Sequence, residues 1–98
     1  MIINVVNENG TVTLTPMEKV DFVSAPELEQ EIEQSAETAD RMILDLCNVD
    51  YISSAGLRAI LLADNLMSEK NGLVLKNVNS YVQEILNISG FSSELKIE

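Results

Sequence analysis

The 98-residue sequence contains no histidine and no tryptophan, and it has only one cysteine and six basic residues. Without histidine, the chain cannot form a Ser-His-Asp or Cys-His catalytic arrangement, and a zinc site loses its commonest nitrogen ligand. No Gly-x-x-x-x-Gly-Lys sequence is present to hold nucleotide phosphates. We therefore expect a protein that is not an enzyme and that needs no cofactor and no metal ion.

The sequence also lacks the features of a membrane-spanning segment, a signal peptide and a disulfide. No apolar run approaches the ~20 residues of a transmembrane helix, and the segment Met1–Val6 lacks the basic residues that open a signal peptide. The single cysteine, Cys47, cannot form an internal disulfide, which suits a reducing compartment. At the end of an apolar run, it is expected to be a small core residue. The sequence predicts one cytoplasmic domain covering residues 1–98.

The charge is strongly one-sided, because 16 acidic residues against six basic ones give a formal net charge of −10. Binding to nucleic acid or to an anionic membrane surface needs clustered lysine and arginine. We expect neither as a partner. The acidity serves either solubility or steering towards a basic surface on a partner protein.

Turn and cap signals divide the first half of the chain into a hairpin and a helix. The pair Asn9-Gly10 separates two β-rich runs, residues 2–6 and 11–16, and predicts a β-hairpin. Ser24 is expected to start a helix as its cap and, with Glu27, to form a capping box. Apolar residues then recur at helical spacing, at Leu28, Ile32, Ala36 and Ala39. The glutamates off this stripe, at positions 29, 31, 33 and 37, form either a solvated face or an acidic docking surface.

The second half alternates strands and helices. We expect a central strand over 42–47, a helix from Ser54 to Asn71 ended by Gly72, and a buried strand over 73–75. A third helix is expected to be capped by Asn79 or Ser80 and ended by Gly90, before a last short strand at 95–97. The order β-β-α-β-α-β-α-(β) predicts an α/β fold, with a mixed four- to five-stranded sheet and about three main helices.

The turn between the central strand and the second helix reads Tyr-Ile-Ser-Ser-Ala-Gly-Leu-Arg over residues 51–58. Either Ser53 or Ser54 can cap the helix while the other hydroxyl stays exposed. Gly56 allows the first turn to pack closely against a neighbour, or another chain to approach the backbone. A helix start also favours negative charge, so a phosphate on one of these serines would be tolerated.

Two further features of this region allow more than one reading. Asp21, Asp45 and Asp50 are either ordinary loop carboxylates or a cluster that could bind a cation, although their spacing matches no metal motif. The second helix is apolar almost all round, with only a narrow polar stripe at Arg58, Asn65 and Glu69. Its surface is either buried under neighbouring helices, or partly exposed for a protein partner.

Residues 45–58 resemble the signature of STAS domains, in particular of bacterial anti-sigma factor antagonists, whose turn reads Asp-Ser-Ser-Gly-Leu or Ser-Ser-Ala-Gly-Leu. Residues 20–25 are similar to the family's Gly-x-Leu-Asp-x-x-x-Ala segment. Glu18 stands in place of its glycine and Val20 in place of its leucine, and Ser53 replaces an aspartate of many members. The resemblance covers essentially the whole chain.

The resemblance implies a protein that binds an anti-sigma factor, itself a serine kinase, and thereby releases a sigma factor for transcription. Phosphorylation of Ser54 would end this binding, and a serine phosphatase would restore it. The partner-binding residues that it implies are Asp21, Ser53, Ser54, Ala55, Gly56, Leu57 and Arg58. The alternative is a STAS scaffold without phosphorylation, such as the soluble subunit of a lipid-transport ATPase.

Overall fold

A five-stranded mixed sheet in the order β1-β2-β3-β4-β5 carries three helices, which confirms the predicted α/β class and element order. The computed structural model describes residues 1–98. Its elements are β1 (Ile3–Glu8), β2 (Thr11–Pro16), α1 (Ala25–Ala36), β3 (Arg41–Asp45), α2 (Ser54–Met67), β4 (Leu73–Lys76), α3 (Ser80–Ile88) and β5 (Lys96–Ile97). Strands β1 and β2 are antiparallel, and all other neighbouring strands are parallel.

The predicted hairpin is confirmed. Asn9 and Gly10 have φ values of 51° and 85°, as a tight two-residue turn between antiparallel strands requires. Pairing continues from Glu8 opposite Thr11 to Ile3 opposite Pro16. The sheet is thus extended by one antiparallel strand at its β1 edge.

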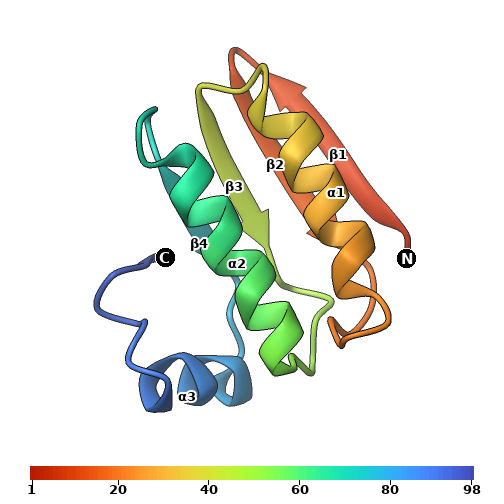
Figure 1. Cartoon of the computed structure of the whole chain (residues 1–98), viewed down its shortest axis with the longest axis vertical. Helices are drawn as coiled ribbons and strands as arrows, with labels where there is room; N and C mark the ends of the chain where they lie inside the picture. The colour runs from red at the N-terminus through yellow and green to blue at the C-terminus, as the bar shows by residue number, and fades with distance from the viewer.

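The core lies between the sheet and helices α1 and α2, which cover the same face, with α2 between α1 and α3 (Figure 1). Met42 and Leu44 of the central strand β3 are fully buried. The stripe predicted for α1 is buried at Leu28, Ile32 and Ala36, whereas Ala39, also buried, lies beyond the end of the helix. None of the three helices has the length and apolar character needed to cross a membrane.

Helix α3 begins and ends where the sequence predicted. The side chain of Asn79 accepts a hydrogen bond from the N–H of Val82 (2.8 Å) and caps the helix. At the other end Gly90 has φ of 80°. The N–H of Phe91 donates to the carbonyl oxygen of Leu86 (3.1 Å), which is the bond of a Schellman motif.

Two predicted boundaries were wrong. Helix α2 ends at Met67 rather than Asn71, because both the N–H and the hydroxyl of Ser68 donate to the carbonyl oxygen of Asn65 and tighten the last turn. Strand β3 ends at Asp45, and Cys47 is exposed rather than a core residue. The Asp45 carboxylate accepts a hydrogen bond from the N–H of Cys47 (3.1 Å), which turns the chain out of the sheet.

Candidate functional site

Two loops at one end of the sheet are joined through their backbones. The N–H of Ser53 donates to the carbonyl oxygen of Val20 (2.9 Å), and the N–H of Val20 donates to that of Tyr51 (3.0 Å). These bonds make an isolated parallel bridge between Val20 and Ile52. The β2–α1 loop therefore lies against the β3–α2 turn, and Asp21, which follows Val20, lies beside it.

Gly56 makes this close approach possible. A Cβ atom at this position would lie 2.6 Å from the carbonyl oxygen of Val20 and 2.6 Å from Cγ1 of Ile52. Both distances are far inside van der Waals contact, and Gly56 is buried. The first turn of α2 therefore packs directly on the bridge, in agreement with the close-packing reading of this glycine.

The two serines of the turn have different roles. Ser53 is the N-cap, with extended backbone (φ −94°, ψ 179°), and its Oγ accepts a hydrogen bond from the N–H of Gly56 (3.3 Å). Ser54 is the first helical residue and is exposed, and its hydroxyl makes no hydrogen bond within the protein. One hydroxyl caps the helix while the other stays free, as the sequence predicted.

Asp21 organises the start of α1. Its Oδ1 accepts hydrogen bonds from the N–H groups of Val23 (2.9 Å) and Ser24 (3.0 Å). The predicted capping box between Ser24 and Glu27 was wrong, because the Ser24 hydroxyl accepts from the N–H of Asp21 and donates to the carbonyl oxygen of Lys19 instead. Ser24 is the N-cap residue of α1 as predicted, but its side chain makes no cap hydrogen bond. Asp21 instead caps the turn over residues 22–24 that leads into the helix.

Replacing Asp21 by alanine is expected to lower the thermal midpoint by roughly 4–8 °C, because the loss of a capping acceptor at a turn costs about 1 kcal/mol in a domain of this size. The variant Asp21→Asn keeps an oxygen acceptor on the side chain and should retain most of the stability. Differential scanning calorimetry of both variants measures this. Equal losses in the two variants would show that the charge, and not the acceptor, matters.

The acidity of Asp21 gives this cap a pH dependence. Hydrogen bonds from the N–H groups of Ser24 and Val23 outweigh partial burial and hold the pKa of Asp21 below its ordinary value of 3.8. A group whose pKa is lowered on folding stabilises the protein above its unfolded pKa, and this contribution is lost as pH falls through the folded value. The cap should therefore be fully effective at neutral pH and weaken below about pH 3.8.

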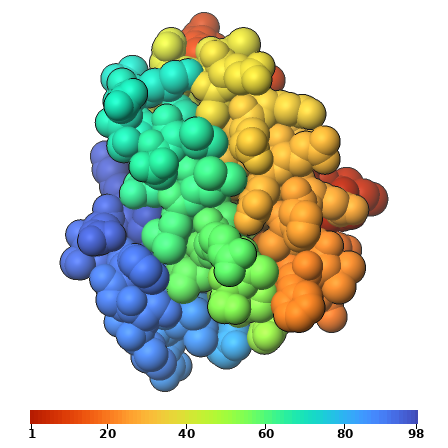
Figure 2. Space-filling model, in the orientation of Figure 1, coloured from red at the N-terminus to blue at the C-terminus, as the bar shows by residue number.

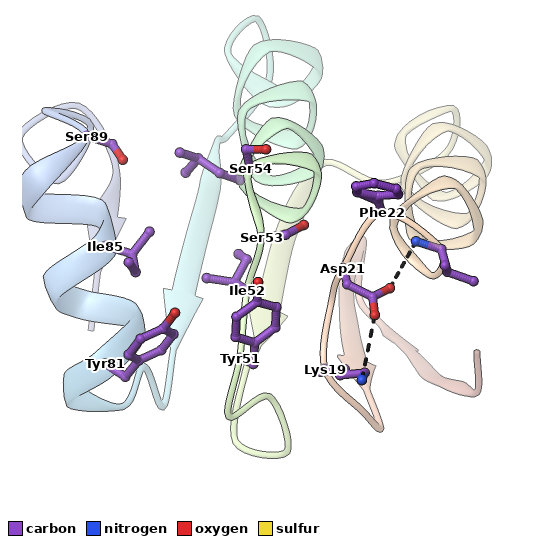
Figure 3. Close-up of a pocket in the computed structure, with 12 residues that line it drawn as sticks. Lys19, Asp21, Phe22, Tyr51, Ile52, Ser53, Ser54, Tyr81, Ile85 and Ser89 are labelled. Atoms are coloured by element: carbon purple, nitrogen blue, oxygen red, sulfur yellow. Dashed lines mark hydrogen bonds and ion pairs between the residues drawn. The ribbon is translucent and has the colours of Figure 1, made fainter.

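A groove of about 910 Å³ opens beside the turn (Figure 3). Three of the chain's four aromatic residues line it, namely Phe22, Tyr51 and Tyr81. The rings of Tyr51 and Tyr81 stack with their centroids 6.0 Å apart, which joins the turn to α3. Phe22 is 72% exposed and Val23 80% exposed, an unusual amount of free apolar surface beside a polar turn.

The groove includes only part of the site implied by the resemblance. Its lining contains Asp21, Ser53, Ser54 and Leu57. Ala55, Gly56 and Arg58 do not line it: Gly56 is buried beneath the turn, and Arg58 is exposed on α2 outside the groove. Lys19 adds a positive charge, with its Nζ 3.8 Å from Oδ2 of Asp21.

The suggested cation cluster is not formed. Asp45 accepts hydrogen bonds from the side chain of Asn77 (2.9 Å) and from the N–H of Cys47. Partial burial alone would raise the pKa of Asp45. The hydrogen bonds from Asn77 and Cys47, with the nearby charge of Lys76, outweigh this effect and hold the pKa below its ordinary value. Asp50 is exposed, and no group of three or more histidine, cysteine, aspartate or glutamate residues is placed to hold a metal ion.

Helix α2 is neither wholly buried nor widely exposed. Its buried side, Gly56, Ala59, Ile60, Ala63 and Met67, packs into the core. Leu57, Leu61, Leu62 and Leu66 are only half-buried, although α1 and α3 flank the helix (Figure 1). Of these leucines, only Leu57 opens into the groove.

Comparison with known proteins places this arrangement in a family. Residues 3–98 match the STAS domain. BtrV of Bordetella bronchiseptica, which carries the name of an anti-sigma factor antagonist, is 41% identical over 76 residues, covering 76% of this chain and 66% of that protein. The match thus spans just under two thirds of the relative's length.

Solved structures share the fold at lower identity. A structure from Thermotoga maritima, described as an anti-sigma factor antagonist, has a TM-score of 0.89 at 19% identity and covers 97% of this chain and 84% of that one. The phosphorylated form of SpoIIAA from Bacillus has a TM-score of 0.77 at 13% identity, covering 99% and 91%. The chain belongs to the STAS domain family, and its relative BtrV carries the name of an anti-sigma factor antagonist.

Proposed function

We propose that this protein is a cytoplasmic anti-sigma factor antagonist that binds its cognate anti-sigma factor, a serine kinase, at the Ser53–Arg58 turn and the adjoining groove. One observation carries the proposal. Ser54 is an exposed serine with a free hydroxyl at a helix start, on the rim of an apolar groove. That combination suits a surface that docks on a protein and also presents a hydroxyl for phosphorylation.

The groove supplies the binding energy in this proposal. Exposed aromatic side chains are the residues that most often dominate protein interfaces, and Phe22, Tyr51 and Tyr81 surround the turn. The stacked tyrosines are held by their mutual contact. The side chain of Asn79 also donates to the carbonyl oxygen of Val49 (2.9 Å), which joins the segment before Tyr51 to the start of the helix that carries Tyr81. A rigid aromatic surface loses little side-chain entropy when a partner binds.

Phosphorylation of Ser54 would act as the switch. A phosphate adds roughly −2 charge at neutral pH, and Ser54 lies where the partner would exclude water. An unpaired charge desolvated in an interface costs several kcal/mol, whereas ~1.4 kcal/mol already changes affinity tenfold. A serine phosphatase would remove the phosphate and restore binding. Binding would release the sigma factor held by the anti-sigma factor, which would link the switch to transcription.

The kinase reaction tests the site directly. Incubated with its cognate anti-sigma kinase and ATP, the protein should gain one phosphate, and Ser54→Ala should abolish the incorporation. Ser53→Ala is the matched control: it removes the cap and costs about 1 kcal/mol of stability, but it should still be phosphorylated. Mass spectrometry locates the phosphate.

A phosphate at Ser53 would contradict the assignment of the two serines. Absence of incorporation with every genomically linked kinase, together with tight binding to a partner, would instead favour the STAS scaffold that docks without phosphorylation. The two outcomes separate the choice of residue from the choice of function.

A further inference from the structure

The two edges of the sheet differ in their protection against pairing with another chain. Strand β5 has only two residues, one of them Lys96, and short charged strands are a usual protection of a sheet edge. Strand β1 has six residues, with no lysine and no proline, and it pairs with β2 without a bulge. The β1 edge is therefore regular and open.

The register of the hairpin determines which backbone groups of β1 are free. The carbonyl oxygen of Ile2 accepts from the N–H of Met17 (3.0 Å), so the even-numbered residues are bonded to β2, since bonding alternates along an antiparallel pair. Ile3 accordingly faces Pro16, which has no N–H to give. The N–H and C=O groups of Ile3, Val5 and Asn7 point away from the sheet and have no hydrogen-bond partner.

The side chains beside this edge are acidic. Met1, Ile3 and four residues of α1 line a polar hollow of about 350 Å³: Glu27, Gln30, Glu31 and Gln34. The N-terminal ammonium of Met1 pairs with Glu27, so Glu31 is the carboxylate of the hollow without an ion pair. Helix α1 carries glutamate at positions 27, 29, 31 and 33 and no basic residue. In Figure 2 the first residues of the chain emerge directly beside α1, at the right of the molecule. A strand added here would meet the free carboxylate of Glu31 on its α1 side.

We propose that β1 accepts an extended segment of a partner protein as a sixth strand, with lysine or arginine side chains on the face that meets α1. The backbone groups of Ile3, Val5 and Asn7 would supply the hydrogen bonds, and Glu31 the charge complement. On the opposite face of the sheet, apolar side chains of the segment would cover Val6, which is 48% exposed. The site is separate from the Ser54 groove and does not depend on the phosphorylation switch.

A second copy of the chain is the less suitable occupant. Antiparallel pairing of two β1 strands about a two-fold axis keeps both α1 helices on the same face of the joined sheet. Their glutamates would then approach one another across the interface, in molecules that each carry a net charge of −10. Like charges facing each other across paired strands are destabilising, whereas a basic segment would be attracted.

Hydrogen exchange and a peptide titration test the proposal together. In the free protein, the amides of Asn4, Val6 and Glu8 should exchange slowly and those of Ile3, Val5 and Asn7 quickly. A short synthetic peptide of alternating valine and lysine, added at low ionic strength, should slow exchange of the three outward amides at least about tenfold. The same peptide with glutamate in place of lysine should not bind.

Variants at the edge complete the test. Val5→Pro removes an outward N–H and leaves the β2 ladder intact, so it should reduce peptide affinity tenfold or more at near-normal stability. Val5→Thr keeps the N–H and should bind as wild type does. Glu31→Gln should weaken binding about two- to fivefold, the range of an exposed ion pair.

Binding that survives Val5→Pro, or no binding of the lysine peptide, would overturn the proposal. Concentration-dependent protection of the outward amides without peptide would overturn it in favour of a second copy.

Discussion

Replacement of Ser54 by aspartate is expected to weaken binding of the anti-sigma partner at least roughly tenfold, an effect of ~1.4 kcal/mol. The new carboxylate would lie on the rim of the groove, where docking excludes water and where Asp21 already contributes negative charge. Lys19, the one basic residue of the groove, already lies close to Asp21, with its Nζ 3.8 Å from Oδ2. Titration calorimetry of the variant and of the wild type against the partner measures the change.

The same substitution should leave the fold nearly unchanged. Ser54 is exposed at the first position of α2, and its hydroxyl bonds to nothing. A negative charge at a helix start is favourable by about 0.3–1 kcal/mol, and exposed changes usually alter stability by under ~0.5 kcal/mol. The thermal midpoint should therefore stay within a few degrees of wild type.

Asn65→Asp is the matched control, because it adds the same charge to an exposed position near the other end of α2. It should change partner affinity less than about twofold, as expected for a single screened surface charge. If both variants lose affinity equally, net charge rather than the position of the charge controls binding. A large loss of stability in Ser54→Asp would mean that Ser54 is chiefly structural.

Gly56→Ala is expected to lower the thermal midpoint by about 10 °C or more. The added methyl would lie 2.6 Å from two atoms of the Val20–Ile52 bridge, one of them the backbone carbonyl oxygen of Val20. Forcing an extra methyl into packed structure costs typically ~1–3 kcal/mol, and each kcal/mol lowers the midpoint of a domain of this size by roughly 4–8 °C. Calorimetry of the variant measures the shift.

The sign of this effect is informative in itself. In a helix with free space, alanine is more stable than glycine by about 1 kcal/mol, so stabilisation by Gly56→Ala would contradict the close contact. Hydrogen exchange adds a local signature, because displacement of Val20 should expose the N–H of Ser53. The control Gly72→Ala meets no atom within 4 Å but has φ of 92°, so it should cost stability without changing exchange at Ser53.

Most of the fold could be predicted from local signals in the sequence. Asn9-Gly10, Asn79 and Gly90 each act within a few residues, and the structure confirms the turn or helix end assigned to each. The predictions that failed concerned neighbouring groups that compete for the same hydrogen bonds. Asp21 and Ser24 both offer acceptors near the start of α1, and only the folded loop determines that Asp21 binds the N–H groups of Val23 and Ser24 just before the helix.

The groove could not be read from the sequence in the same way. Ser53, Ser54 and Leu57 belong to one turn with a distinctive sequence, but Phe22 and Tyr81 come from other parts of the chain. Tyr81 meets Tyr51 because β3 and β4 are parallel neighbours, whose following segments leave the same end of the sheet. A predicted parallel pairing was the one signal that could have placed these aromatic residues together.

The central claim is that a phosphate on Ser54 ends binding to the anti-sigma factor. Its most direct test is a titration of the anti-sigma factor with the unmodified protein and with the protein phosphorylated at Ser54, at the same ionic strength. We predict tight binding of the unmodified protein and an affinity at least roughly tenfold lower after phosphorylation, equivalent to ~1.4 kcal/mol or more. Equal affinities of the two forms would contradict the claim.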